Sequence, residues 1–548
     1  MASALLSTIL SIHPALVLLG IAIILLLARF FRKSSIRVLP GPTDGRSLLG
    51  FEREFETSKP DTQDSLFQWH TQYGTAYRIP GLLWSDILVV SDPRALQYIL
   101  HSSGYGYRKP DDLRYFSIAA AGRGILYSEG KSHARQRKIL NPAFSVTQLK
   151  EFLVFFQRST TQLLDRLDER VGQGTERLDI SHWAAQLALD AVGEATFGHN
   201  FGALDGHTDD LFKANERAMR VFSDISLRTL LARAIRRHIP VELTARFSNI
   251  VPSNDAIMIR GAGSMRRIAA GDILAKAKQE AEGYDLNTRK DILSVLVKCN
   301  NAAEPKKRMS DEEVLSQTAS IIQAGHHVTG AFMAWLFYEL AHHPEDQQKI
   351  YEEIQAFRAK NGYDVEFTVA DYESMAYLNA FLKENLRYHA VVSLLIREAT
   401  YDDLIPLATP VVSPNTGETI THVPVQKGQR IILDFASYNR LRDVWGEDAY
   451  EWNPSRFLDP NSKRTQYNVG MYSNILTFSG GAQGCIGFRF GLIEAQTIIV
   501  GILERFILMA PPEGLHIQGV RSGLMMPMVA GKWGEGMQVP LMLKRREQ

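Results

Sequence analysis

Cysteine is scarce in this chain, which holds only Cys299 and Cys485 among its 548 residues. Two cysteines cannot form a disulfide framework, so the chain is not a small disulfide-stapled domain, and a reducing compartment such as the cytosol suits it. An excess of either charge is also lacking, because 61 Lys and Arg residues offset 60 Asp and Glu residues. This balance gives no support for a polyanionic partner, and we predict no binding to nucleic acid.

Long apolar runs are confined to the N-terminus. Residues 15–28 carry no charge, and with the residues back to Ala2 the run reaches the roughly 20 residues that cross a bilayer. Basic residues follow it directly, which places the rest of the chain on the cytosolic side; they are Arg29, Arg32, Lys33 and Arg37. The alternative is a cleaved secretory signal peptide, but that needs basic residues before the apolar run. We therefore expect an uncleaved single-pass anchor over residues 1–31.

A stiff connector follows the anchor. The segment Leu39-Pro40-Gly41-Pro42 sets two prolines around a glycine, which excludes a helix. We interpret residues 32–45 as a basic, proline-rich hinge. Repeats, low-complexity tracts and long polar linkers are lacking after it, so residues 46–548 are expected to form one unit.

Helical patterns dominate that unit. Ser310 and Glu313 form a capping box, and the helix it begins meets no proline before Pro344. That is about 33 residues, or roughly 50 Å, which crosses a whole domain. Further helices are expected at 345–357 and 372–389. Strands are expected at 76–80, 87–90, 423–425 and 430–433, so we predict a fold that is mainly α with minor β.

The strongest chemical signal is the run Phe478-Ser-Gly-Gly-Ala-Gln-Gly-Cys485-Ile-Gly487. Its glycines allow the backbone to pass where side chains would clash, and a helical pattern follows Gly487. Cys485 is therefore expected at a helix N-terminus, where free amides and the dipole stabilise a thiolate. A thiolate is a strongly electron-donating ligand for a heme iron. Local physics alone leaves open an acid-shifted redox thiol or a packed residue.

This run resembles the heme-binding loop of the cytochrome P-450 family, which Phe478, Gly481, Cys485 and Gly487 match. The resemblance implies the P-450 fold over 46–548, heme b as cofactor and Cys485 as the axial ligand of its iron. Gln483 stands where the family usually has Arg or His to meet a heme propionate. A neutral amide can donate a hydrogen bond there but lacks the charge.

Two further segments match scaffold motifs of the family. Glu384-Asn-Leu-Arg387 resembles its Glu-x-x-Arg motif, whose members share one helix face. Trp452-Asn-Pro-Ser-Arg456-Phe457 resembles the segment whose arginine completes a triad with that pair. The resemblance assigns Glu384, Arg387 and Arg456 to stability behind the heme and not to chemistry.

Three basic residues resemble partners of the heme propionates. His133 stands where the family has Trp, Arg137 follows one helical turn later, and Arg397 follows the Glu-x-x-Arg helix. The alternative is that all three are plain surface cations. A second basic set could form the docking face that the family offers to an acidic reductase, although charge runs are usually just solvated; its members are Lys131, Arg135, Lys138 and Arg489.

The expected oxygen site departs from the family. Its helix motif is Ala or Gly, Gly, any residue, an acid, Thr, then Thr or Ser, with the glycine admitting oxygen. Here Gly325 and Thr329 match, whereas His327 replaces the acid and Val328 the first Thr. Three interpretations compete: His327 and a water relay protons, Thr329 or a substrate hydroxyl does so, or an atypical reaction needs no relay. We favour oxygenase chemistry through one of the first two.

The resemblance implies a monooxygenase that puts one atom of O2 into an apolar small molecule, in the style of fungal secondary metabolism. Electrons from NADPH would arrive through NADPH-cytochrome P-450 reductase, with cytochrome b5 as a second candidate donor. The expected location is the endoplasmic reticulum membrane. Substrate contacts are expected at 115–126, 321–324, 391–395 and 525–526. Alternatives are a heme-thiolate isomerase or dehydratase and a non-catalytic heme-binding protein.

Overall fold

The computed structural model describes most of the chain, namely residues 34–43, 50–51, 65–206, 210–220, 225–246, 252–283, 291–459 and 465–547. The predicted anchor at 1–31 lies outside these residues, and the predicted hinge at 32–45 is described only at 34–43. None of the described helices combines the length and the apolar character needed to cross a bilayer.

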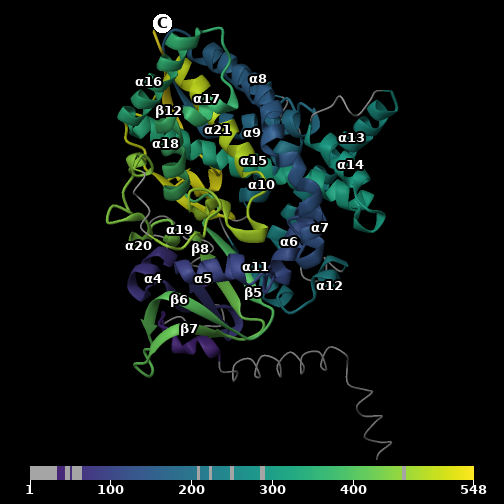
Figure 1. The fold of residues 1–548 in the computed structure, drawn as a ribbon, viewed down its shortest axis with the longest axis vertical. Coiled ribbons are helices and arrows are strands. Elements are labelled where there is room, and N and C mark those ends of the chain that lie inside the picture. Colours follow the sequence, from purple (N-terminus) through teal and green to yellow (C-terminus); the bar gives the residue numbers. More distant parts are fainter. Residues whose placement is uncertain are drawn as a thin grey trace, which may run out of the picture.

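Helices make up most of the described chain (Figure 1). The longer ones are α8 (Val146–Val171), α9 (Ile180–Phe197), α13 (Asn254–Gly283), α15 (Asp311–His342), α16 (Pro344–Asn361) and α21 (Phe488–Arg505). The shorter ones are α4 (Ser65–Tyr73), α5 (Pro93–Gln97), α6 (Asp111–Ala121), α7 (Gly130–Leu140), α10 (Asp210–Arg220), α11 (Leu227–Arg236), α12 (Val241–Arg246), α14 (Ile292–Ala302), α17 (Val369–Ser374), α18 (Ala376–Tyr388), α19 (Phe435–Tyr438) and α20 (Arg442–Trp445).

Strands form small sheets. The largest has the order β1-β2-β8-β5-β3, and β6 with β7 forms a hairpin beside it, at the lower end of Figure 1. These strands are β1 (Ala76–Pro80), β2 (Asp86–Val90), β3 (Tyr107–Arg108), β5 (Leu394–Ala399), β6 (Asp403–Val412), β7 (Thr419–Val425) and β8 (Arg430–Asp434). The other sheets are β4-β12-β9 and β10-β11, built from β4 (Thr175–Asp179), β9 (Phe506–Met509), β10 (Ile517–Ser522), β11 (Leu524–Val529) and β12 (Pro540–Arg545).

The expected long helix is confirmed as α15. Ser310 caps the Glu313 amide while the Glu313 carboxylate accepts from the Ser310 amide, and the helix ends at His342, before Pro344. The helix expected at 372–389 is divided, because Met375 takes an extended conformation between α17 and α18.

The four expected strands are present as β1, β2, β7 and β8. The last two pair with different partners, however, since β7 pairs with β6 while β8 pairs with β2 and β5.

The main core surrounds α15, which packs closely against α9. Two glycines make this approach possible. A Cβ at Gly325 would lie 2.5 Å from Val192 of α9, and a Cβ at Gly330 would lie 3.1 Å from Ala185 of α9. Any larger side chain at Gly325 would push the two helices apart.

Candidate active site

The cysteine loop is a tight turn before α21. The Cys485 amide donates to the Phe478 carbonyl at 2.9 Å, and the Gly484 amide donates to the Gly481 carbonyl at 3.1 Å. Gly481 has φ +66°, and a Cβ there would lie 1.8 Å from the carbonyl oxygen of Leu100. Only glycine fits this position, so the loop geometry depends on it.

Cys485 precedes the first residue of α21, Phe488, with Gly487 as the N-cap. Burial raises the pKa of its thiol, while a hydrogen bond from the Gly487 backbone and the charge of Arg137 lower it. The cysteine is nevertheless solvent-accessible. A side chain that is both surrounded by protein and accessible faces a hollow. The Gly487 amide and Arg137 offset only part of the effect of burial, so the pKa of the thiol stays above its usual value.

Helix α15 packs against α21, and its buried middle part contains one exposed residue. Ala324 is exposed in the middle of this otherwise buried helix, and Val328, one turn later on the same face, is half-buried. Thr329 shares the neighbouring face with Gly325, which contacts α9. The structure therefore places Val328 beside Ala324, and it turns Gly325 and Thr329 toward α9.

A buried polar network lies beside the loop. Arg397 of β5 donates through Nη2 to Gln483 Oε1 at 3.1 Å, and Gln483 Nε2 donates to Glu129 Oε2 at 2.8 Å. Lys109 Nζ lies 3.4 Å from Glu129 Oε1. Because β3 pairs with β5, Lys109, which follows β3, comes close to Arg397. The neutral amide of Gln483 thus links a cation to an anion.

His133 and Arg137 of α7 complete this network. His133 Nδ1 lies 2.8 Å from the Tyr105 hydroxyl, and its ring is 3% exposed. Burial, with the charges of Lys109 and Arg137, lowers the pKa of His133 to about 4, so the ring is neutral at pH 7. Arg137 donates to the Gly484 carbonyl, next to Cys485. The surface-cation alternative is wrong for His133 and Arg397, because both are buried.

The charges in this network do not balance. Lys109, Arg137 and Arg397 supply three positive charges, and Glu129 is the one carboxylate that faces them among the described residues. Buried cations need partners, and two are left over. The two propionates of heme b carry the matching charge, and Cys485 supplies a ligand for its iron. The residues present therefore fit a thiolate-ligated heme.

Sequence reasoning missed three members of this network: Tyr105, Lys109 and Glu129. Glu129 begins the segment that carries His133, and its charge beside two expected cations was a usable signal. Tyr105 and Lys109 belong to no motif, and only the pairing of β3 with β5 brings them to the site.

Replacing Lys109 by methionine is expected to speed heme loss. The variant lowers the net charge of the network from two to one, and an interaction with a charged group is worth about 1.5–3 kcal/mol, or roughly 10- to 100-fold in dissociation. Transfer of heme to an excess of a scavenging globin apoprotein measures the rate. The control is Lys131→Met on α7, whose side chain is exposed. Equal rates in the two variants would contradict the role of Lys109.

The three scaffold residues lie together in the interior. Arg387 donates to both carboxylate oxygens of Glu384, through Nε at 2.8 Å and Nη2 at 2.7 Å. Arg456 Nε lies 3.1 Å from Glu384 Oε2. Arg387 also donates to the carbonyls of Asn439 and Ala449, so this cluster ties α18 to the segment before the cysteine loop.

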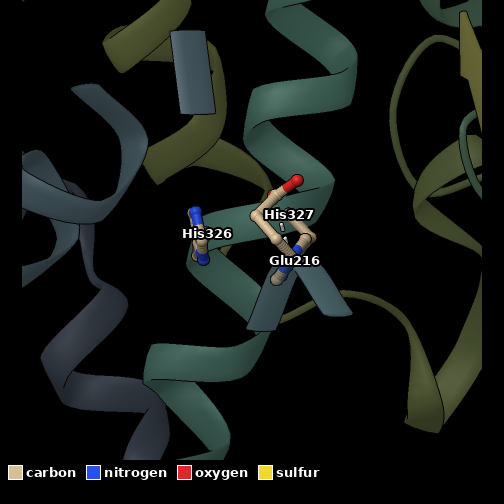
Figure 2. A group of neighbouring side chains, drawn as sticks. All are labelled: Glu216, His326 and His327. Atoms are coloured by element: carbon tan, nitrogen blue, oxygen red, sulfur yellow. Dashed lines mark ion pairs between the residues drawn. The ribbon is translucent and has the colours of Figure 1, made fainter. Parts of the chain in front are cut away.

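His327 lies opposite a carboxylate of another helix (Figure 2). Its Nε2 is 3.7 Å from Glu216 Oε1 of α10. His326 lies beside it, with Nδ1 3.4 Å from Asn215 Nδ2. Burial lowers the pKa of His326 to about 3 and that of His327 well below its usual value, and Arg266 lowers both further. Both rings are therefore neutral.

Glu216, His326 and His327 are also the right residue types for a metal. Their donor atoms lie within 4.8 Å of one another. Ligands of one tetrahedral Zn²⁺ at about 2.0–2.2 Å are roughly 3.3 Å apart, so the donors would have to close up against the positive charge of Arg266. We therefore interpret the cluster as a pair of proton-carrying groups, Glu216 and His327, with His326 packed beside them.

The glycine loop that holds Cys485, the hollow that this cysteine faces and the surplus positive charge of the polar network together define a heme-thiolate protein. Comparison with known proteins agrees: the model of the cytochrome P450 family matches residues 40–532. The chain belongs to this family.

Several relatives come from fungi. Cytochrome P450 monooxygenase 205 of Postia placenta is 32% identical over 93% of both chains. Ganoderic acid synthetase CYP5150L8 of Ganoderma lucidum is 31% identical over 87% of this chain and 89% of its own. Cytochrome P450 monooxygenase claO of Ampulloclitocybe clavipes is 28% identical over 95% and 96%. The protein is accordingly a fungal-type P450 monooxygenase, which uses heme b and receives electrons from NADPH through a reductase.

Proposed function

We propose that this protein inserts one oxygen atom into an apolar small molecule, an intermediate of secondary metabolism such as a terpenoid, polyketide or alkaloid. The observation that carries this proposal is Cys485 facing a hollow that is bordered by two surplus positive charges. One relative is named for the synthesis of ganoderic acid, which supports a role in making a specific small molecule.

Each turnover has a fixed stoichiometry of substrate, O2, electrons and protons. A substrate C–H, O2, two electrons and two protons give a C–OH and one water. When bound, the thiolate-ligated heme supplies the activation of O2, since the ligand favours O–O cleavage. The protein must bring in the electrons and the protons and must hold the substrate.

Proton supply falls to His327 in this proposal, because its helix lacks the acid and the first threonine of the family motif. His327 Nε2 has no hydrogen-bond partner among the described residues, so this nitrogen is open to a proton in transit, while the depressed pKa keeps the ring neutral at rest. Thr329 lies one turn after Gly325 and is half-buried, so a water would have to connect it to the oxygen site. We therefore assign the larger share to His327.

Membrane attachment is part of the same proposal. An anchor over residues 1–31 would hold the protein on the cytosolic side of the endoplasmic reticulum membrane, next to NADPH-cytochrome P-450 reductase and cytochrome b5. The exposed cations Lys131, Lys138 and Arg489 support a docking face near the heme loop. Arg135 contributes less, because it pairs with Glu313 of α15.

Labelled oxygen tests the function. Full-length protein is produced in a host that supplies the reductase, substrates are found by metabolite profiling, and turnover is run under 18O2. We expect one labelled atom in the product and NADPH consumed in proportion. A product without label would favour the isomerase or dehydratase, and heme binding without any turnover would favour the non-catalytic protein; either outcome contradicts the proposal.

A further inference from the structure

Glu216 lies between the protein surface and the interior. Its side chain is 30% exposed and belongs to the lining of a surface cleft of about 660 Å³. The wall of this cleft holds several exposed or half-buried polar side chains beside apolar ones; the polar ones include Arg170, Arg177, Asp179, His182, Arg220 and Glu535. Solvent protons therefore reach the Glu216 carboxylate.

The other side of Glu216 faces a small inner pocket. This pocket has a volume of about 20 Å³ and is lined by Glu216 and His327 together with four methionines, Met219, Met526, Met528 and Met537. A volume above about 10–15 Å³ holds one water. Glu216 and His327 are the groups in its wall best placed to exchange a proton, because they lie 3.7 Å apart (Figure 2).

Charges around the pair suit proton transfer. Burial raises the pKa of Glu216, Arg220 lowers it and Asp179 raises it, so the acid form persists to a higher pH than usual. Burial, His326 and Arg266 hold the pKa of His327 well below its usual value, and a hydrogen bond with the Asn215 backbone offsets only part of this effect. The raised pKa keeps more of Glu216 protonated at a given pH, and Nε2 of the neutral His327 ring lies 3.7 Å from its carboxylate. Because the depressed pKa of His327 disfavours the charged ring, the imidazole accepts a proton at one nitrogen as it releases one elsewhere.

We propose that Glu216 is the proton entry of this enzyme: it supplies from α10 the carboxyl group that α15 lacks. The proposal rests on the proposed oxygenase function and on His327 as the relay. Glu216 takes a proton from the cleft and passes it to His327, which passes it toward the face of α15 that carries Ala324 and Val328. The cleft then reprotonates the carboxylate, and two such transfers provide the protons of the water formed in each turnover.

Two variants at one position test this. Glu216→Gln keeps the shape and cannot exchange a proton, whereas Glu216→Asp keeps a carboxyl group. General acid–base catalysis contributes about 10²–10⁴-fold, so we expect Glu216→Gln to lower coupled kcat by at least roughly 10-fold, with KM and heme content unchanged. Glu216→Asp should recover most of that loss. The matched control is Glu535→Gln, a carboxylate of the same cleft that does not line the inner pocket.

The pH profile separates a proton donor from a merely structural residue. Because the acid form is the donor, coupled kcat of the wild type should fall as the pH rises through the raised pKa of Glu216. Glu216→Gln should lack this limb, and its kcat should show a larger solvent deuterium effect. Coupled turnover of Glu216→Gln equal to that of the wild type, an equal loss in Glu535→Gln, or no recovery in Glu216→Asp would each overturn the proton entry alone. A wild type that incorporates no oxygen would overturn the proposed function and the entry with it.

Discussion

Replacing Cys485 by alanine is expected to abolish the red-shifted absorption band that carbon monoxide gives with a thiolate-ligated ferrous heme. The reason is local: the Cys485 amide is tied to Phe478, so the loop holds the sulfur of residue 485 and no other ligand atom in that place. Electron donation from the thiolate is also lost, and with it the activation of O2. Reductase-supported turnover should become undetectable. The reduced carbon monoxide difference spectrum and the turnover assay measure the two effects.

Cys299 is the matched control, because it is the one other cysteine of the chain. It lies half-buried on α14, away from the glycine loop that holds Cys485. Cys299→Ala should keep the full red-shifted band. Survival of that band in Cys485→Ala, or its loss in Cys299→Ala, would contradict the assignment of the ligand.

Replacing Glu384 by alanine is expected to prevent stable folding. Both Glu384 and Arg387 have completely buried side chains, and the carboxylate receives two hydrogen bonds from Arg387 and further ones from Arg456 and the Asn453 amide. Removing it leaves a guanidinium buried without its anion, which costs about 3–5 kcal/mol. That is a large share of the roughly 5–15 kcal/mol that stabilises a typical protein. Yield of heme-loaded protein and the midpoint of denaturant unfolding measure the loss.

An exposed ion pair provides the control. Arg442 and Glu447 lie 3.8 Å apart with side chains 53% and 91% exposed. Water screens such a pair, so Glu447→Ala should leave the unfolding midpoint unchanged. If Glu384→Ala unfolded at the wild-type midpoint, the buried triad would not be what holds α18 to the segment before the cysteine loop.

The sequence predicted a helix or strand well where residues inside or next to that element carried the signal. The capping box and the proline defined α15 to within a residue or two, because both act on the backbone groups at helix ends. The break at Met375 was missed, since no glycine or proline marks it. Sheet partners were beyond reach as well: 423–425 and 430–433 are close in sequence, yet they pair with strands of different sheets.

The candidate site also combines residues that one short motif reveals with residues that only tertiary packing brings together. Phe478, Gly481, Cys485 and Gly487 lie within ten residues, so one short motif reveals the ligand. Other groups lie far from it in the chain and carry no motif, so nothing in the sequence connects them to the heme; these are Tyr105, Lys109 and Glu216. Their roles follow from strand pairing and from the packing of α10 across α15.

The sequence by itself determined the family, the long helix and its departure from the family motif at His327 and Val328, and it predicts Cys485 as the iron ligand. These features depend on the identity and spacing of neighbouring residues, which short-range backbone geometry translates directly into structure. Only the tertiary structure decided how the departure is met, because the absent acid has its proposed counterpart in Glu216 of α10. Charge compensation acts through space, so the compensating residue is free to come from any element that folds beside the site.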